Sequence, residues 1–204
     1  MINQMACYIV KKMKRNNVID EDKMELYIFG IEILLITIIK YLGLFIIALL
    51  LGVVKEAITF IIAFSMLRIQ AGGVHLKSFW QCFAITNIIT FSCIFLVKAL
   101  PINHTMIYQM IMLVISIILV LVFAPVDTEN KPLSELEKKL YKKRSAYVII
   151  IGSIITVSLS MVYHSFIIYG NIVSLGFLCE GITLMPLEAI KKLYRGGELN
   201  EGKN

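Results

Sequence analysis

The chain has 204 residues, of which 58% are hydrophobic, and it carries a formal net charge of +6. Soluble domains are about 45–50% apolar, so the composition excludes an ordinary soluble domain and indicates one integral membrane domain over residues 1–204. Long isoleucine and leucine runs without strand-like alternation favour helices over a β-barrel. Basic residues that flank apolar spans account for the charge, so we expect no nucleic-acid partner.

The N-terminal segment, residues 1–20, combines apolar residues at helical spacing with basic residues between them. A cleavable signal peptide would place its charge before an unbroken apolar core, which this segment lacks. We expect an amphipathic helix that either lies on the inner membrane surface or packs on the rest of the protein. The apolar positions are Ile2, Met5, Ile9, Val10 and Met13, and the basic ones are Lys11, Lys12, Lys14 and Arg15.

Six apolar stretches follow, and each is a candidate transmembrane helix. The first is long enough to tilt or to break near Lys40 and Gly43. With both termini in the cytoplasm, all of the 20 Lys and Arg residues except Lys40, Lys55 and Lys98 fall on the cytoplasmic side, which supports this orientation. The approximate ranges are 26–54, 56–67, 83–100, 106–124, 146–168 and 170–189.

The loop at 127–145 is rich in lysine and carries a helix-start pattern. Ser134 and Glu137 form a capping-box pattern after Pro132, so we expect a short helix that leads into the fifth span. The basic side chains favour either an anchor next to anionic lipid or a docking surface for an acidic peptide.

Residues 68–82, RIQAGGVHLKSFWQC, form a polar interruption on the cytoplasmic side and contain His75 and Cys82 seven positions apart. On one straight helix the two side chains would lie about 10 Å apart along the axis and would run parallel. A nucleophile and its base need to approach to roughly 3 Å. The glycine pair Gly72-Gly73 predicts a break in the helix, which would allow a closer approach.

A second capping-box pattern follows the glycine pair, with Ser78 as the cap and Gln81 at the third helical position. A helix that starts there places Cys82 in its first turn and lets His75 fold back over it. A helix N-terminus favours a thiolate, and its unpaired backbone N–H groups suit an oxyanion. The alternative is a surface loop in which Trp80 is an interfacial anchor.

The other three cysteines show no pattern of their own. Cys7, Cys93 and Cys179 have no CxxC or zinc-ligand spacing with each other or with Cys82. We therefore expect free thiols, with no metal site and no cofactor.

At these motifs the chain resembles the accessory gene regulator B family, membrane cysteine endopeptidases of Gram-positive quorum-sensing systems. The resemblance covers nearly the whole chain, from the basic amphipathic N-terminus to the last span. Between Arg68 and Gly73 the sequence reads Ile-Gln-Ala-Gly, where some relatives have more basic or histidine-rich residues, a difference that bears on substrate preference. The matching motifs are Arg68…Gly73-x-His75, Ser78-Phe79-Trp80, Cys82, Ala124-Pro125, Lys131-Pro132 and Glu180-x-Ile182-Thr183-Leu184-x-Pro186.

The resemblance implies a function and site residues. Cys82 would be the nucleophile and His75 its general base, while Arg68 and Gly73 match positions tied to activity. Glu180 matches a family position without an assigned role. The implied substrate is a short precursor peptide, whose acidic C-terminal tail is removed at the inner face of the bacterial cytoplasmic membrane. The remaining piece would close into a thiolactone or lactone ring through an acyl-enzyme thioester.

Two other classes of protein remain open from the residues alone. A transporter would place polar residues deep in several spans, and only Glu32, Lys40 and Glu180 are candidates for such positions. A membrane scaffold subunit would use residues 68–82 only as a loop. The sequence leaves the oligomeric state open, with a homodimer as one option.

Overall fold

The computed structural model describes residues 2–16, 19, 24–73, 79–99, 105–126 and 133–185. These residues form seven α-helices and one short 3-10 helix, with no strand among them, so the predicted all-α fold is confirmed. The elements are α1 (Ile2–Arg15), α2 (Met24–Leu50), α3 (Val54–Ala71), α4 (Phe79–Ala99), α5 (Thr105–Phe123), α6 (Glu135–Val162), η3 (His164–Phe166) and α7 (Ile167–Thr183).

Five of the described helices are long and apolar enough to cross a membrane, namely α2, α4, α5, α6 and α7. The chain is therefore a multi-pass membrane protein. The remaining predicted span, the second at 56–67, corresponds to α3, which has three charged residues, Lys55, Glu56 and Arg68, among its eighteen. Helix α3 is less apolar for this reason, so the count of six spans stays a prediction. The orientation of the termini is likewise still a prediction.

Helix α2 corresponds to the first predicted span. It runs unbroken through Lys40 and Gly43, so of the two alternatives for this span, a tilt or a break, the break does not occur. Glycine alone does not interrupt a helix inside a membrane. If the helix broke, its backbone N–H and C=O groups would find no water there to hydrogen-bond with. The chain turns instead after Leu50, where Gly52 has a φ of +66°. This is the left-handed region that favours glycine, and it lets α3 begin at Val54.

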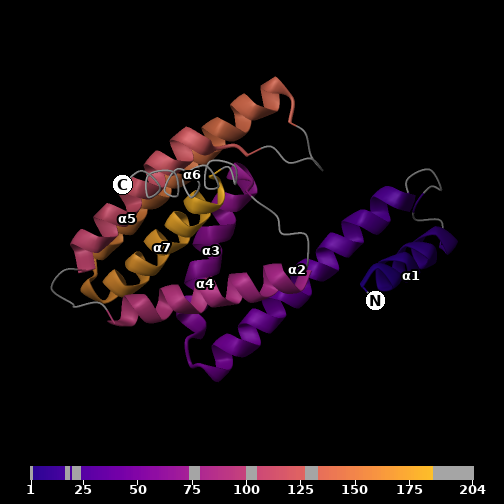
Figure 1. The fold of residues 1–204 in the computed structure, drawn as a ribbon, viewed down its shortest axis with the longest axis horizontal. Coiled ribbons are helices and arrows are strands. Elements are labelled where there is room, and N and C mark those ends of the chain that lie inside the picture. The colour runs from indigo at the N-terminus through magenta and orange to yellow at the C-terminus, as the bar shows by residue number, and fades with distance from the viewer. Residues whose placement is uncertain are drawn as a thin grey trace, which may run out of the picture.

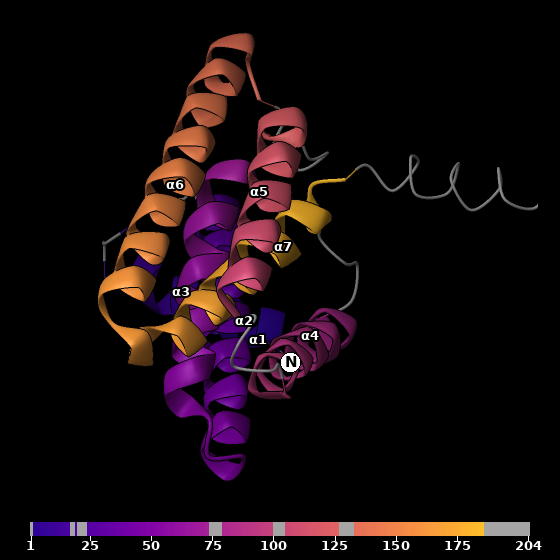
Figure 2. The same ribbon diagram turned by 90° about the vertical axis from the view of Figure 1, so that its left-hand side faces the viewer.

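Four helices, α3, α5, α6 and α7, gather into one bundle, which we call the four-helix bundle (Figures 1 and 2). Helix α7 packs against the other three members and also against α4. Helices α2 and α4 cross each other beside the bundle, and α1 lies along α2 (Figure 1). The last described helix therefore lies at the centre of the fold.

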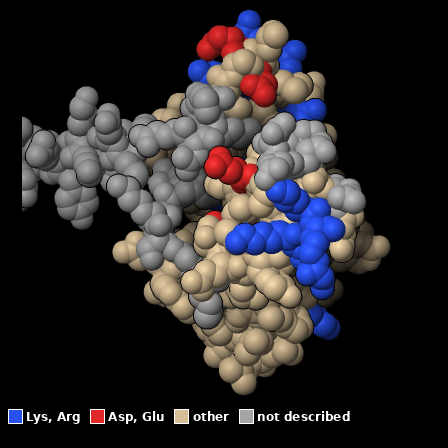
Figure 3. Space-filling model, turned by 90° about the vertical axis from the view of Figure 1, so that its right-hand side faces the viewer, with Lys and Arg blue, Asp and Glu red and all other residues tan. Residues whose placement is uncertain are grey.

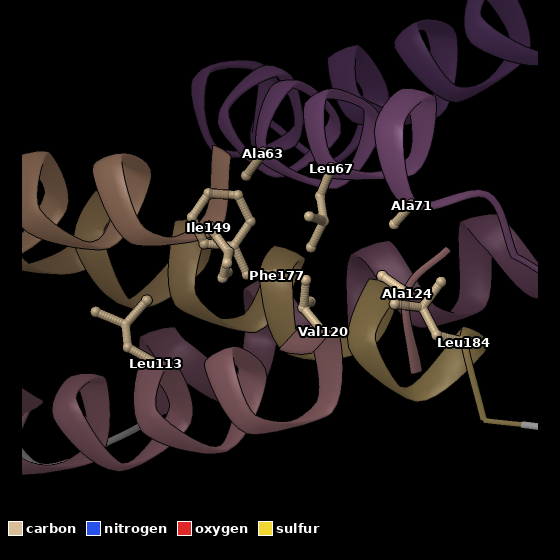
Figure 4. Packing of buried hydrophobic residues seen from close by; sticks show 9 residues of the cluster. All are labelled: Ala63, Leu67, Ala71, Leu113, Val120, Ala124, Ile149, Phe177 and Leu184. Atoms are coloured by element: carbon tan, nitrogen blue, oxygen red, sulfur yellow. The ribbon is translucent and has the colours of Figure 1, made fainter. Parts of the chain in front are cut away.

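The apolar core of the four-helix bundle is made by residues from all four helices (Figure 4). Phe177 of α7 lies among Ala63 and Leu67 of α3 and Ile149 of α6. Small residues let the helices approach, as is typical of helix packing in membranes. The whole cluster consists of Ala63, Leu67, Ala71, Leu113, Val120, Ala124, Ile149, Phe177 and Leu184.

Helix α1 packs on α2 through its apolar face. Ala6 and Val10 are fully buried, and the Asn3 side-chain amide donates to a Glu32 carboxylate oxygen at 2.9 Å. This is the second of the two arrangements expected for the N-terminal segment, and contact with a lipid surface stays a prediction. Figure 3 shows basic side chains gathered in a patch over α1, whose last turn carries Lys12, Lys14 and Arg15.

The predicted helix start at Ser134 is confirmed. The Ser134 hydroxyl accepts from the backbone N–H of Glu137, and the Glu137 carboxylate accepts from the backbone N–H of Ser134 at 2.9 Å. The helix that starts here does not end before the fifth span. It continues as α6 to Val162, so the expected short helix and the span are one helix.

Candidate functional site

The predicted break before the candidate site is confirmed. Helix α3 ends at Ala71, and Gly72 and Gly73 follow with φ values of +80° and +131°. Helix α4 then begins at Phe79. His75 and Ser78 lie outside the described residues, so their predicted roles as base and helix cap stay predictions.

Cys82 lies in the first turn of α4, as the sequence predicts. It is the fourth residue of the helix, one after the exposed Gln81, and it is half-buried. The Thr86 hydroxyl donates to the Cys82 carbonyl oxygen at 2.8 Å, one turn further along the helix. The thiol therefore lies on a helix, nine positions after Gly73 in the chain.

A lysine from α2 contacts this thiol. The Lys40 ammonium group donates to Cys82 Sγ at 3.3 Å, between residues 42 positions apart in the chain. The sequence marked Lys40 only as one of three candidates for a polar residue deep in a span. Glu32 of the same helix accepts a hydrogen bond from Asn3 instead.

The contact depends on a close crossing of α2 and α4, which we call the α2–α4 crossing (Figure 1). A Cβ atom on Gly43 would lie 2.8 Å from two ring carbons of Phe83, so any larger residue would require that ring to move. Phe83 also contacts Trp80 edge to face, with ring centroids 6.4 Å apart. Because Gly43 has no side chain, the Phe83 ring near the start of α4 can lie close to the backbone of α2.

The residues that the family resemblance singled out beside His75 and Cys82 meet at the end of α3. The Arg68 Nη1 atom lies 3.1 Å from Glu180 Oε2 and donates to the Thr183 hydroxyl at 3.2 Å. A Cβ atom on Gly73 would lie 2.6 Å from Arg68 Nη1 and 2.9 Å from Thr183 Oγ1. We call these four residues, Arg68, Gly73, Glu180 and Thr183, the Gly73 bracket.

The Gly73 bracket gives Glu180 a structural role that the sequence did not supply. Its side chain is fully buried, and the Arg68 guanidinium compensates its charge. Because Gly73 packs directly on the ion pair, the bracket fixes the point from which the chain departs toward His75. The backbone N–H of Val126 donates to the Ala71 carbonyl at 2.9 Å, which ties the same point to the end of α5.

All four cysteines are free thiols, as expected. The Cys93 and Cys179 sulfur atoms lie 3.6 Å apart, between α4 and α7, a contact that the sequence did not predict. Cys7 lies on α1, where its thiol contacts the Asn3 side chain at 3.7 Å. Cys82 is thus the cysteine that contacts a cationic group.

Comparison with known proteins finds relatives that are similar over most of the chain. The model of the family described as accessory gene regulator B matches residues 3–184. An accessory gene regulator protein B of Staphylococcus aureus is 31% identical over 188 residues, which is 91% of this chain and 93% of the relative. An AgrB-like protein of Clostridium perfringens is 33% identical over 171 residues, 81% of this chain and 80% of the relative. No solved structure matches the chain.

The family match spans the whole described fold, from α1 to the end of α7, and it includes both the Gly73 bracket and Cys82. The chain therefore belongs to the accessory gene regulator B family, and its function lies in accessory gene regulation, a form of quorum sensing.

Proposed function

We propose that the protein is a membrane cysteine endopeptidase that removes the acidic C-terminal tail of a short precursor peptide and promotes cyclisation of the remaining piece. The observation that carries the proposal is the position of Cys82 in the first turn of α4, the helix that follows the glycine turn in the chain. A thiol in a first helical turn is near unpaired backbone N–H groups, which favour a thiolate and an oxyanion.

In the first step, His75 takes the proton of Cys82, and the thiolate attacks the scissile carbonyl of the precursor. The tetrahedral intermediate collapses, the amine of the tail leaves with a proton from the imidazolium, and a thioester joins the precursor to Cys82. This step needs no metal or cofactor.

In the second step, a cysteine or serine side chain of the precursor attacks the thioester. The ring closes as a thiolactone or lactone, and Cys82 is released. Exchange of one thioester for another is close to energetically neutral, so a thiolactone can form without ATP. Water has to be kept from the thioester, and a half-buried thiol at the crossing of two apolar helices suits this requirement.

The site would face the inner side of the bacterial cytoplasmic membrane, with both termini on that side. The distribution of basic residues supports this orientation. The acidic tail of the precursor would be attracted by the positive charge of the lysine-rich segment at 127–145. These two features together would bring the cleavage point to Cys82.

Co-expression with a candidate precursor tests the proposal. We expect Cys82→Ala and His75→Ala each to abolish removal of the tail, measured by mass spectrometry of the peptide, while the protein still accumulates in the membrane. Cys7→Ala is the matched control, because it removes a thiol on α1, and it should process the precursor normally. Full processing by Cys82→Ala would overturn the proposal and favour a transporter or scaffold.

A further inference from the structure

The lysine at the α2–α4 crossing is an ionisable group in an apolar helix. Between Glu32 and the end of α2 at Leu50, Lys40 is the sole charged residue, and its neighbours read Ile-Thr-Ile-Ile before it and Tyr-Leu-Gly-Leu after it. An ionisable side chain in such a setting is costly and usually has a functional partner. Its hydrogen-bond partner among the described residues is Cys82 Sγ, at 3.3 Å.

Two contacts directly after Lys40 in the chain fix its part of α2. The hydroxyl groups of Tyr41 and Ser65 lie 2.9 Å apart and join α2 to α3. Gly43, on the next turn, takes the Phe83 ring against the helix backbone and joins α2 to α4. The Lys40 ammonium group is therefore directed at the first turn of α4 by contacts with both neighbouring helices.

The other charged groups on the helices that pack against α4 have different partners or positions. Lys98, at the far end of α4, pairs with Glu56 of α3 at 2.7 Å. Arg68 of α3 pairs with Glu180 of α7 at 3.1 Å. Lys55 is exposed at the first turn of α3. Within the described helices, the cation at the thiol is thus Lys40.

We propose that Lys40 is a third catalytic residue, whose ammonium group stabilises the Cys82 thiolate. The inference rests on the proposed function, in which Cys82 is the nucleophile. A hydrogen bond from a cation to an anion is stronger than one between neutral groups, and an apolar setting strengthens it further. Lys40 keeps its proton throughout, while His75 carries the proton between the thiol and the leaving amine.

The same group acts after the thiolate has attacked. The negative charge moves from sulfur to the carbonyl oxygen of the tetrahedral intermediate, two bonds from Sγ. The flexible lysine side chain can follow this charge and add to the backbone N–H groups of the first turn. When the ring closes and Cys82 leaves, the ammonium group stabilises the released thiolate again.

Alkylation of Cys82 in the intact protein tests this role. We expect Lys40→Met, which keeps the length of the side chain but not its charge, to lower the rate of reaction of Cys82 with iodoacetamide near neutral pH by about tenfold or more. The pH at which the rate rises should move upward, because the thiolate is less favoured. Tail removal from the precursor should fall by a similar factor. Mass spectrometry resolves each cysteine, so Cys7 is a reference in the same sample.

Two variants separate charge from shape. Lys40→Arg keeps the positive charge and should retain much of the rate, whereas Lys55→Met removes an exposed lysine of α3 and should change nothing. An unchanged rate and pH profile in Lys40→Met, or a rate in Lys40→Arg as low as in Lys40→Met, would overturn the inference. The proposed function would stand in either case if Cys82→Ala still abolished tail removal, so the two can fail separately.

Discussion

The four-helix bundle and the α2–α4 crossing are packed in different ways. Nine of the seventeen residues of α7 are buried, whereas two of the twenty-seven residues of α2, Leu44 and Ala48, are buried. In the bundle, charge is enclosed and compensated within the protein, as in the pair of Arg68 and Glu180. At the crossing, charge contacts the thiol sulfur of Cys82 at a half-buried position.

Under the proposed function, the four-helix bundle would support the fold and the α2–α4 crossing would hold the reacting thiol. The bundle holds the end of α3 and the Gly73 bracket in one position, because its helices constrain each other on several sides. The crossing leaves much of α2 and the first turn of α4 uncovered, so under the proposed function a peptide would approach the thiol without opening the bundle. Substitutions in the two regions should therefore affect different measurements.

The largest effect is expected from breaking the buried ion pair. Arg68→Ala would leave the Glu180 carboxylate buried without its compensating charge, at a cost of about 3–5 kcal/mol. The expected result is a much lower melting temperature of the purified protein in detergent and reduced accumulation in the membrane.

A double variant is the control for this prediction. Arg68→Met with Glu180→Met replaces both charges with apolar groups of similar length, and it should recover most of the lost stability. If Arg68→Ala melts at the wild-type temperature, the pair does not support the bundle in the way described.

A pair of glycine substitutions compares the two regions directly. A Cβ atom on Gly176 would lie 3.2 Å from the Phe60 carbonyl oxygen, a backbone atom that cannot move alone. Gly176→Leu should separate α7 from α3 and cost about 1–3 kcal/mol. Gly43→Leu would displace the Phe83 ring, and it should lower the alkylation rate of Cys82 with little change in melting temperature.

Both glycine variants are to be measured by both methods, melting and alkylation. We expect each variant to change one of the two measurements. Gly176→Leu should lower the melting temperature, and Gly43→Leu should lower the alkylation rate of Cys82. Equal losses of stability in the two variants would contradict the division between the bundle and the crossing.

The smallest effect is expected at the exposed start of α6. Ser134→Ala removes the hydroxyl that accepts from the Glu137 backbone, at a cost of about 1 kcal/mol. Faster amide hydrogen exchange in the first turn of α6 should reveal the loss, and Ser134→Asp should restore protection. Alkylation of Cys82 should not change, so an altered rate would show that this end of α6 communicates with the crossing.

Local signals in the sequence predicted the course of the helices well. The apolar runs predicted α4 and α5 to within a few residues, and the glycine pair and the Ser134 pattern predicted one helix end and one helix start. Each of these features depends on residues within a few positions of each other. The break near Gly43, one of two alternatives for the first span, does not occur, because a glycine in the sequence does not show which helix packs against it.

The contacts at the candidate site could not be predicted in the same way. Lys40 and Cys82 are 42 positions apart, and Arg68 and Glu180 are 112 apart. Which partner each charge takes depends on how helices cross, and a hydropathy pattern does not specify crossings. The lone lysine within an apolar span was nevertheless a usable signal, since such a charge requires a partner.

The Gly73 bracket has a consequence for biosynthesis. Its two halves come from the end of α3 and the end of α7, so Arg68 and Gly73 are made more than a hundred residues before Glu180 and Thr183. At about 5–20 residues per second, roughly 5–20 seconds separate the two events on the ribosome. The position of the chain at Gly73 is therefore fixed only after the last described helix has been inserted, and the candidate site is among the last parts of the protein to be completed.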